Sequence, residues 1–108
     1  MQPPRPRRLW LDAYVLDTLM GDLVGHDHTP AAFVVYLYLW KESRRVRRGR
    51  VGASHRTVAE DTGLSKSAVQ AAVRLLKRRQ LLRSFQASQT AVPEYEVLRP
   101  WARRRAEP

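Results

Sequence analysis

The 108-residue chain contains no cysteine, only five glycines and no hydrophobic run long enough to span a bilayer. The missing thiols exclude disulfides and thiolate metal sites, as is typical of proteins in a reducing cytosol. The most apolar run, residues 31–40, has ten residues, about half of the roughly 20 that a membrane helix needs. The basic N-terminus, MQPPRPRRLW, lacks the apolar stretch of a signal peptide. We therefore expect a cytoplasmic location and no membrane partner.

Acidic residues are scarce in the middle of the chain. Residues 43–83 carry twelve Lys/Arg against two Asp/Glu, whereas residues 1–42 carry four against five and residues 84–108 four against three. The net charge of +10 therefore arises in the middle segment. A localised basic excess is typical of nucleic-acid binding, whereas an anionic membrane would require large apolar residues beside the charges. The excess of Arg over Lys fits phosphate and guanine recognition, and it equally fits a GC-rich genome.

The length of the chain predicts one domain, which we place at residues 10–99. Residues 1–9 are rich in proline and arginine and are interpreted as a flexible basic arm. Residues 100–108 are interpreted as a basic tail, which either adds nonspecific affinity for a polyanion or is simply solvated.

Two helices are expected in the first half of the domain. Apolar residues recur every three or four positions over residues 10–24, and Gly25 is expected to end that helix. Thr29 as cap and Pro30 at the first position predict a second helix over residues 30–43. This second helix is apolar on nearly every side, so the N-terminal helix, the basic region or a second copy must cover it. A homodimer through these two helices is the simplest way to cover its surplus face.

Two shorter helices are expected over residues 54–79. Ser54 is placed to cap the first of them and Ser65 to cap the second, over residues 66–79. Gly63 is expected to adopt a left-handed conformation in the turn between them. On the second helix, one arc is apolar and the opposite arc carries Ser67, Gln70, Ala71, Arg74 and Arg78.

Strands are expected near residues 50–52 and over residues 82–86 and 94–98. The last two would form a hairpin within residues 82–98 around the polar tip ASQTAVP. The predicted fold class is therefore mainly α with a small β-hairpin, an α+β domain.

The stretch VGASHRTVAEDTGLSKSAVQAAVRLLKRRQLLRSF resembles the winged helix-turn-helix DNA-binding domains of GntR-type bacterial transcription regulators, and is broadly similar to MarR-type domains. The matching features are the small Ala59 between the helices, Gly63 in the turn, Ser65 as cap, apolar core positions and the paired leucines before the hairpin. The resemblance implies a winged helix-turn-helix domain with an added N-terminal helix. It also implies that helix 66–79 enters the major groove of double-stranded DNA.

The resemblance implies which residues face DNA. Gln70 can pair with adenine and Arg74 with guanine or phosphate, while the serines and Lys66 are expected on the backbone. Arg56 matches a position that often carries a basic contact in GntR-type domains. The predicted DNA-binding residues are Ser54, Arg56, Ser65, Lys66, Ser67, Gln70, Arg74, Arg78 and Gln89.

Two positions depart from the family pattern. Gln80 stands where such domains commonly have glycine, so the end of the helix is expected to be strained or capped in another way. The tip of the hairpin lacks the arginine that many wings insert into the minor groove, which limits Gln89 and its neighbours to phosphate contacts.

Other chemistry is not expected. The HDH motif at residues 26–28 and the isolated His55 do not have the spacing of a metal site, and we interpret HDH as a surface loop. No carboxylate pair, nucleophile elbow or glycine-rich phosphate loop is recognisable. We therefore predict a protein without enzymatic activity, metal or cofactor.

The predicted function is sequence-specific binding of double-stranded DNA by a dimeric, nucleoid-associated bacterial transcription regulator. One alternative is a replication-initiation or mobile-element protein that uses the same fold on repeated sites. Another is a winged-helix protein-protein interaction module that docks a protein partner through helix 30–43.

Overall fold

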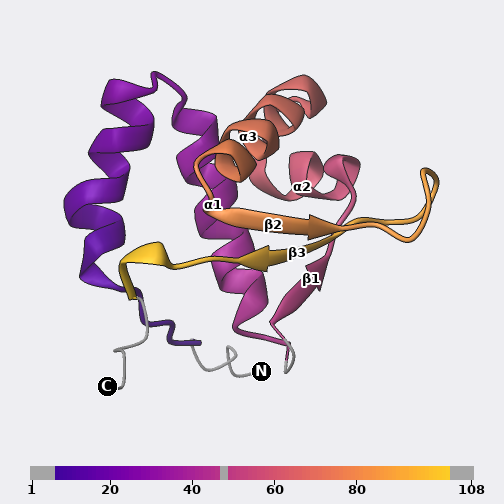
Figure 1. The fold of residues 1–108 in the computed structure, drawn as a ribbon, viewed down its shortest axis with the longest axis horizontal. Coiled ribbons are helices and arrows are strands. Elements are labelled where there is room, and N and C mark those ends of the chain that lie inside the picture. Colours follow the sequence, from indigo (N-terminus) through magenta and orange to yellow (C-terminus); the bar gives the residue numbers. More distant parts are fainter. Residues whose placement is uncertain (1–6, 47–48, 103–108) are drawn as a thin grey trace, which may run out of the picture.

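The computed structural model describes residues 7–46 and 49–102, which form an α+β structure of helices around a three-stranded antiparallel sheet. Figure 1 shows the N-terminal helical segment, residues 13–26, at the left. The helix α1 lies behind the sheet, and α3 lies above the sheet. No helix of the described part of the chain is both long and apolar enough to cross a membrane.

The N-terminal helical segment differs from its prediction. Residues 10–12 have neither helix nor strand, and helical turns begin at residue 13. Two π-helical stretches follow, η1 (Val15–Leu19) and η2 (Gly21–His26). Their hydrogen bonds span five residues, as in the 2.8 Å bond from Asp27 N–H to Asp22 O. Helix 10–24 was therefore predicted to start three residues too early. Gly25 does not end it, because the wider π turn continues through this glycine.

The helix α1 (Pro30–Ser43) has its predicted bounds, with Pro30 in the first turn. Thr29 occupies the cap position, but its side chain accepts no capping hydrogen bond; its hydroxyl donates to Asp27 O at 2.9 Å. The central residues Val35, Tyr36 and Leu39 are fully buried. The covering elements are η2, α2, α3 and the sheet, so one chain buries most of this helix by itself.

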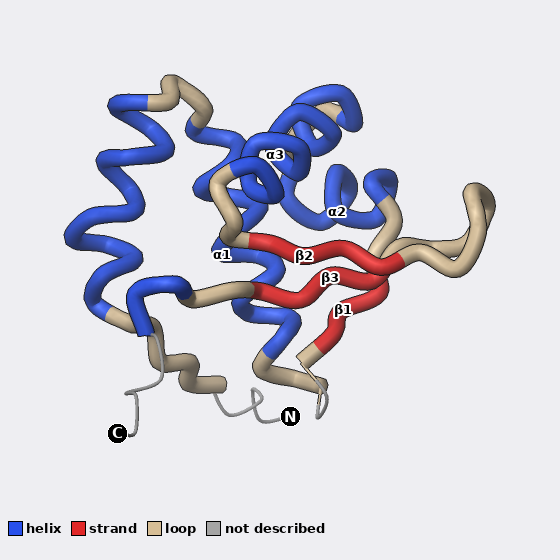
Figure 2. Tube along the Cα trace, in the orientation of Figure 1, coloured by secondary structure: helices blue, strands red, loops and turns tan. Residues whose placement is uncertain are grey.

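The sheet has the strand order β1-β3-β2, with β1 (Arg50–Gly52), β2 (Leu82–Phe85) and β3 (Glu94–Val97). Val51 pairs with Tyr95 and Arg83 with Glu96 in the antiparallel register. Alternate residues face the core, as expected for a sheet with one solvated side. The β2–β3 loop projects away from the body of the molecule (Figure 2), and both hairpin strands are one residue shorter than predicted.

The helices α2 (His55–Thr62) and α3 (Lys66–Arg78) begin and turn as predicted. Ser54 Oγ accepts a hydrogen bond from Thr57 N–H at 3.0 Å, and Ser65 Oγ accepts one from Ala68 N–H at 3.1 Å. Gly63 has a left-handed backbone with φ of 85°. These side-chain caps fix the start of each helix and hence the exposed side that each presents.

Gln80 confirms the strain predicted after α3. Its φ of 61° is left-handed, a conformation that favours glycine. Gln80 N–H donates to Lys77 O and Leu81 N–H donates to Leu76 O, at 3.0 and 2.8 Å. This hydrogen-bond pair satisfies the last carbonyls of α3 and turns the chain into β2.

The ends of the described chain meet. Trp101, in the short helix η3 (Pro100–Ala102), stacks on Tyr14 with ring centroids 4.6 Å apart. Its indole N–H and the Arg99 guanidinium both donate to Asp12 Oδ2. Burial opposes ionisation of Asp12, but these two donors outweigh it and lower the pKa of the carboxyl. Trp101, within the stretch predicted as a basic tail, therefore packs against the domain, whereas Pro100 and Ala102 are exposed.

Two predictions concern residues that are only partly described. Of the predicted arm, residues 1–6 lie outside the described part, and residues 7–9 are exposed and have neither helix nor strand. Of the predicted tail, residues 103–108 lie outside it.

Candidate nucleic-acid interface

A groove of about 570 Å³ lies between α3, the first turn of α2 and the hairpin strands. From α3, it is lined by Lys66, Gln70, Arg74 and Lys77. These residues share one side of the helix because four residues advance an α-helix by little more than one turn. The apolar side of α3, which includes Val69, Ala72 and Leu76, is buried against the core.

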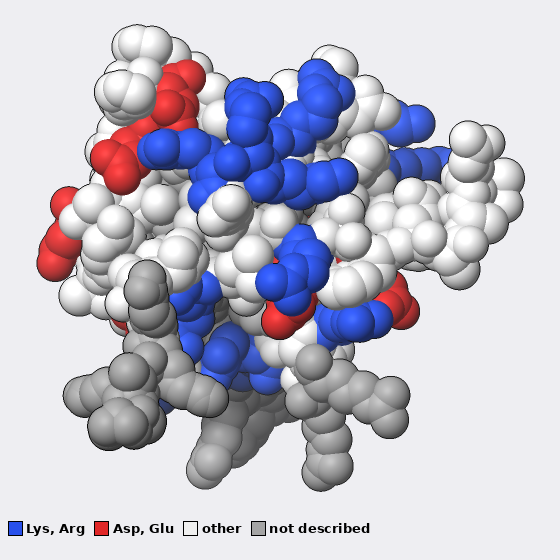
Figure 3. Space-filling view, in the orientation of Figure 1, with Lys and Arg blue, Asp and Glu red and all other residues white. Residues whose placement is uncertain are grey.

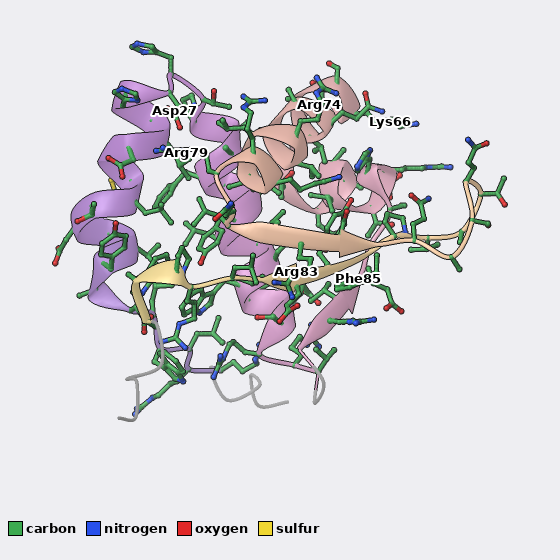
Figure 4. All side chains as sticks on the ribbon, viewed as in Figure 1. Asp27, Lys66, Arg74, Arg79, Arg83 and Phe85 are labelled. Atoms are coloured by element: carbon green, nitrogen blue, oxygen red, sulfur yellow. The ribbon has the colours of Figure 1, made fainter. Side chains whose placement is uncertain are left out.

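The cations of α3 are available to a ligand. Within residues 7–46 and 49–102, Lys66, Arg74, Lys77 and Arg78 form no ion pair with a carboxylate, and no carboxylate lines the groove. Figure 3 shows Lys and Arg side chains gathered over α3, whereas acidic side chains gather over the N-terminal helical segment. In Figure 4, Lys66 and Arg74 extend outward from α3. Cations that form no ion pair with a carboxylate suit a polyanion.

Other basic residues are already paired. Arg79 Nε lies 3.0 Å from Asp27 Oδ2 in the loop before α1, and Arg83 Nη1 lies 3.2 Å from Glu96 Oε1. Figure 4 shows Arg83 and Phe85 on the sheet, away from Lys66 and Arg74. These arginines tie elements together, in contrast to the free cations of α3.

The structure brings most of the predicted DNA-binding residues together. Ser54, Arg56, Lys66, Gln70 and Arg74 all line the groove. Arg56 is also held by Glu60, with Nε 3.1 Å from Oε2. Its charge is therefore partly compensated, and it is a weaker candidate than the α3 cations.

The predicted serines have structural roles as well. Ser65 Oγ caps α3 and lies 3.3 Å from Ser67 Oγ, where either hydroxyl can donate. Ser54 Oγ caps α2 and also donates to Thr57 Oγ1 at 3.1 Å. Backbone N–H groups at the start of α3 lie beside Ser65 and Ser67, and the positive end of the helix dipole is there.

Four predicted residues are not part of the groove lining, namely Ser65 and Ser67 beside it and Arg78 and Gln89 farther away. Arg78 lines a second hollow of about 390 Å³ together with Asp27 and Thr29, and Arg74 lines both hollows. Gln89 lies in the β2–β3 loop. Gln86, at the start of this loop, donates to Ala91 O at 2.7 Å and to Gln89 O at 3.4 Å, so its amide braces the loop.

Sequence reasoning missed Lys77 and His55. Lys77 had a detectable signal, since eleven residues after Lys66 complete about three helical turns and return to the same side. No local sequence signal pointed to His55, because its partner is 40 residues away. The Tyr95 hydroxyl and His55 Nε2 share a hydrogen bond of 3.2 Å. Burial, followed by the charges of Lys66, Lys77 and Arg74, lowers the pKa of His55.

The groove thus combines four side chains of one exposed helical side with hydrogen-bonding groups on α2 and the sheet. It can bind an extended anion and offer amide and guanidinium groups to it. Comparison with known proteins finds no match for this chain among protein-family models, curated proteins or solved structures.

Proposed function

We propose that this protein binds double-stranded DNA, with α3 in the major groove. The observation that carries the proposal is the row of Lys66, Gln70, Arg74 and Lys77 on one side of a capped helix. No carboxylate of the described residues lines the same groove. Such a row combines sequence-independent attraction to phosphates with groups that distinguish base edges. Binding rather than catalysis is the function proposed.

We further propose that the α+β structure is a winged helix-turn-helix domain. The order helix, strand, helix, helix, strand, strand supports this assignment, as do the three-residue turn between α2 and α3 and the projecting β2–β3 loop. The loop takes the place of the wing, with Gln89 as a backbone contact.

The proposed roles divide the residues into two groups. Gln70 and Arg74 read base edges, because both line the groove from the middle of α3 and both can bond bidentately. Contacts to the DNA backbone come from the remaining candidates, namely Ser54, Arg56, Ser65, Lys66, Ser67, Lys77 and Arg78.

The decisive experiment compares two triple variants in a salt titration with a random-sequence duplex. Replacing Lys66, Lys77 and Arg78 with Gln should lower the slope of log affinity against log salt by about 2.7, or 0.9 for each lost phosphate contact. Replacing Arg44, Arg45 and Arg83 with Gln removes the same charge elsewhere and should leave most of that slope. Equal losses in both variants would show that α3 is not the contact surface.

We also propose that the protein forms a homodimer through the N-terminal helical segment. Since α1 is largely covered within one chain, the available apolar side is on the N-terminal helical segment, where Leu16, Met20 and Val24 are 50%, 39% and 36% exposed. A two-fold dimer would bind a pseudo-palindromic site. Sedimentation should show that the wild-type protein is a dimer and that Met20→Glu dissociates it. The control Val92→Glu, in the β2–β3 loop, should remain a dimer. A monomeric wild-type protein would refute the proposed homodimer.

The same exposed apolar residues favour one second candidate, a protein-protein interaction module. This role predicts that DNA binding is weak and insensitive to salt.

Selection from a random DNA pool separates the two DNA-binding roles that remain. A selected sequence with two half-sites would fit a nucleoid-associated transcription regulator. A selected sequence with several repeats would fit a replication-initiation or mobile-element protein.

A further inference from the structure

His55 is held inside the proposed DNA-binding groove. It occupies the first turn of α2, next to the cap residue Ser54, and lines the groove together with the α3 cations. Tyr95, which is 2% exposed, shares a hydrogen bond with His55 Nε2 through its hydroxyl at 3.2 Å. This tether orients a half-buried imidazole ring at the position where a bound backbone would pass.

The charges around His55 are positive. Lys66, Arg74 and Lys77 face it from α3, and α2 contributes Arg56, which is paired with Glu60. The strands contribute only neutral groups, the Tyr95 hydroxyl and Ser84. Burial is the largest cause of the lowered pKa of His55, and the three α3 cations add to it. In the free protein the ring is therefore neutral at physiological pH.

We propose that His55 is a phosphate-binding residue of this groove and that it takes up a proton from solvent when the DNA backbone enters. This inference rests on the proposed DNA-binding function. A phosphate offsets the repulsion between the three α3 cations and the protonated ring of His55. The phosphate also accepts a hydrogen bond from the imidazolium. Both effects favour the protonated ring in the complex, so DNA binding and protonation strengthen each other.

The test is the pH dependence of affinity for a short random-sequence duplex, measured by fluorescence anisotropy at constant ionic strength. Between about pH 8 and pH 5, wild-type affinity should rise as the pH falls, by at most about tenfold per pH unit, the limit for one linked proton. His55→Gln should remove this dependence. His55→Arg carries a permanent charge and should bind tightly with little pH dependence.

The matched control is His26→Gln, which removes an exposed histidine outside the groove and should retain the wild-type pH dependence. Circular dichroism checks that each variant is folded. NMR titration of the His55 ring supplies a second measurement, and its pKa should be higher in the complex than in the free protein.

The possible failures are distinguishable. A wild-type protein that binds the duplex equally at all pH values, or a His55→Gln variant that keeps the wild-type pH dependence, would overturn the role of His55 and leave DNA binding intact. An unchanged ring pKa on binding would overturn it as well. Absence of duplex binding at every pH would refute the proposed function itself.

Discussion

The N-terminal helical segment and α3 both bury one apolar side against α1, yet they are built differently. The helix α3 has a serine cap, a hydrogen-bonded end and unpaired cations on its exposed side. The N-terminal segment is π-helical, has no side-chain cap, contains two glycines and exposes apolar and acidic side chains. Local sequence signals thus account for α3, whereas contacts with the rest of the chain hold the N-terminal segment.

The largest expected contrast comes from deleting a buried leucine in each region. Leu76 and Leu23 are both fully buried, and Leu→Ala costs about 2–5 kcal/mol depending on how far the site can collapse. Leu76→Ala should cost more, because α3 is packed against α1, α2 and β2, whereas η2 packs against α1 and η1. Denaturant unfolding of both variants measures the difference. A larger loss for Leu23→Ala would show that the N-terminal segment is the more constrained region.

The next contrast concerns caps. Ser65→Ala should destabilise the protein by about 1 kcal/mol, because it leaves the Ala68 N–H without its acceptor. Thr29→Ala, at the junction of the N-terminal segment and α1, should cost less, since that hydroxyl does not cap α1. Thermal unfolding of the two variants tests this ordering, and equal costs would contradict it.

Two stabilising substitutions probe the helix backbones. Gln80→Gly relieves the left-handed strain after α3 and should raise the free energy of unfolding by about 1 kcal/mol. Gly21→Ala should add about 0.5–1 kcal/mol, because the new Cβ would meet no heavy atom within 4 Å and a helical glycine is costly. Gly63→Ala is the control and should destabilise, since its φ is 85°. Stabilisation by all three would refute this reading of the backbone.

The smallest expected effect concerns the ion pair of Asp27 with Arg79, which links the two regions. Its contribution to the free energy of unfolding should depend on acid. The hydrogen bond from His26, together with the charge of Arg79, lowers the pKa of Asp27 despite its burial. A lowered carboxyl pKa stabilises the fold above the ordinary value near 4, and this stabilisation is lost as the pH falls through the lowered value. Asp27→Asn should reduce the loss of stability on acidification by less than about 1 kcal/mol, which is what a partly exposed ion pair typically contributes. Unfolding curves from neutral to acidic pH measure it, with Glu60→Gln as the exposed control.

The same contrast explains which features could be predicted from the sequence. Ser54, Gly63 and Ser65 act on neighbours within a few residues, so the bounds of α2 and α3 and the groove side of α3 followed from local patterns. Lys77 could have been included by the same periodicity. The π-helical hydrogen bonds and the His55–Tyr95 pair could not be predicted. They depend on residues far apart in the sequence or on the balance of packing around a segment.

The contacts of Asp12 also have a mechanical consequence. Its carboxylate bonds to Arg99 and Trp101, which follow it by 87 and 89 positions. The short helix η3 and the start of the N-terminal helical segment lie at the same end of the molecule, away from α3 (Figure 1). A force that pulls the ends apart would load these bonds first. Under tension, the N-terminal segment and η3 should peel away in an early extension step, while α3 and the sheet are still folded.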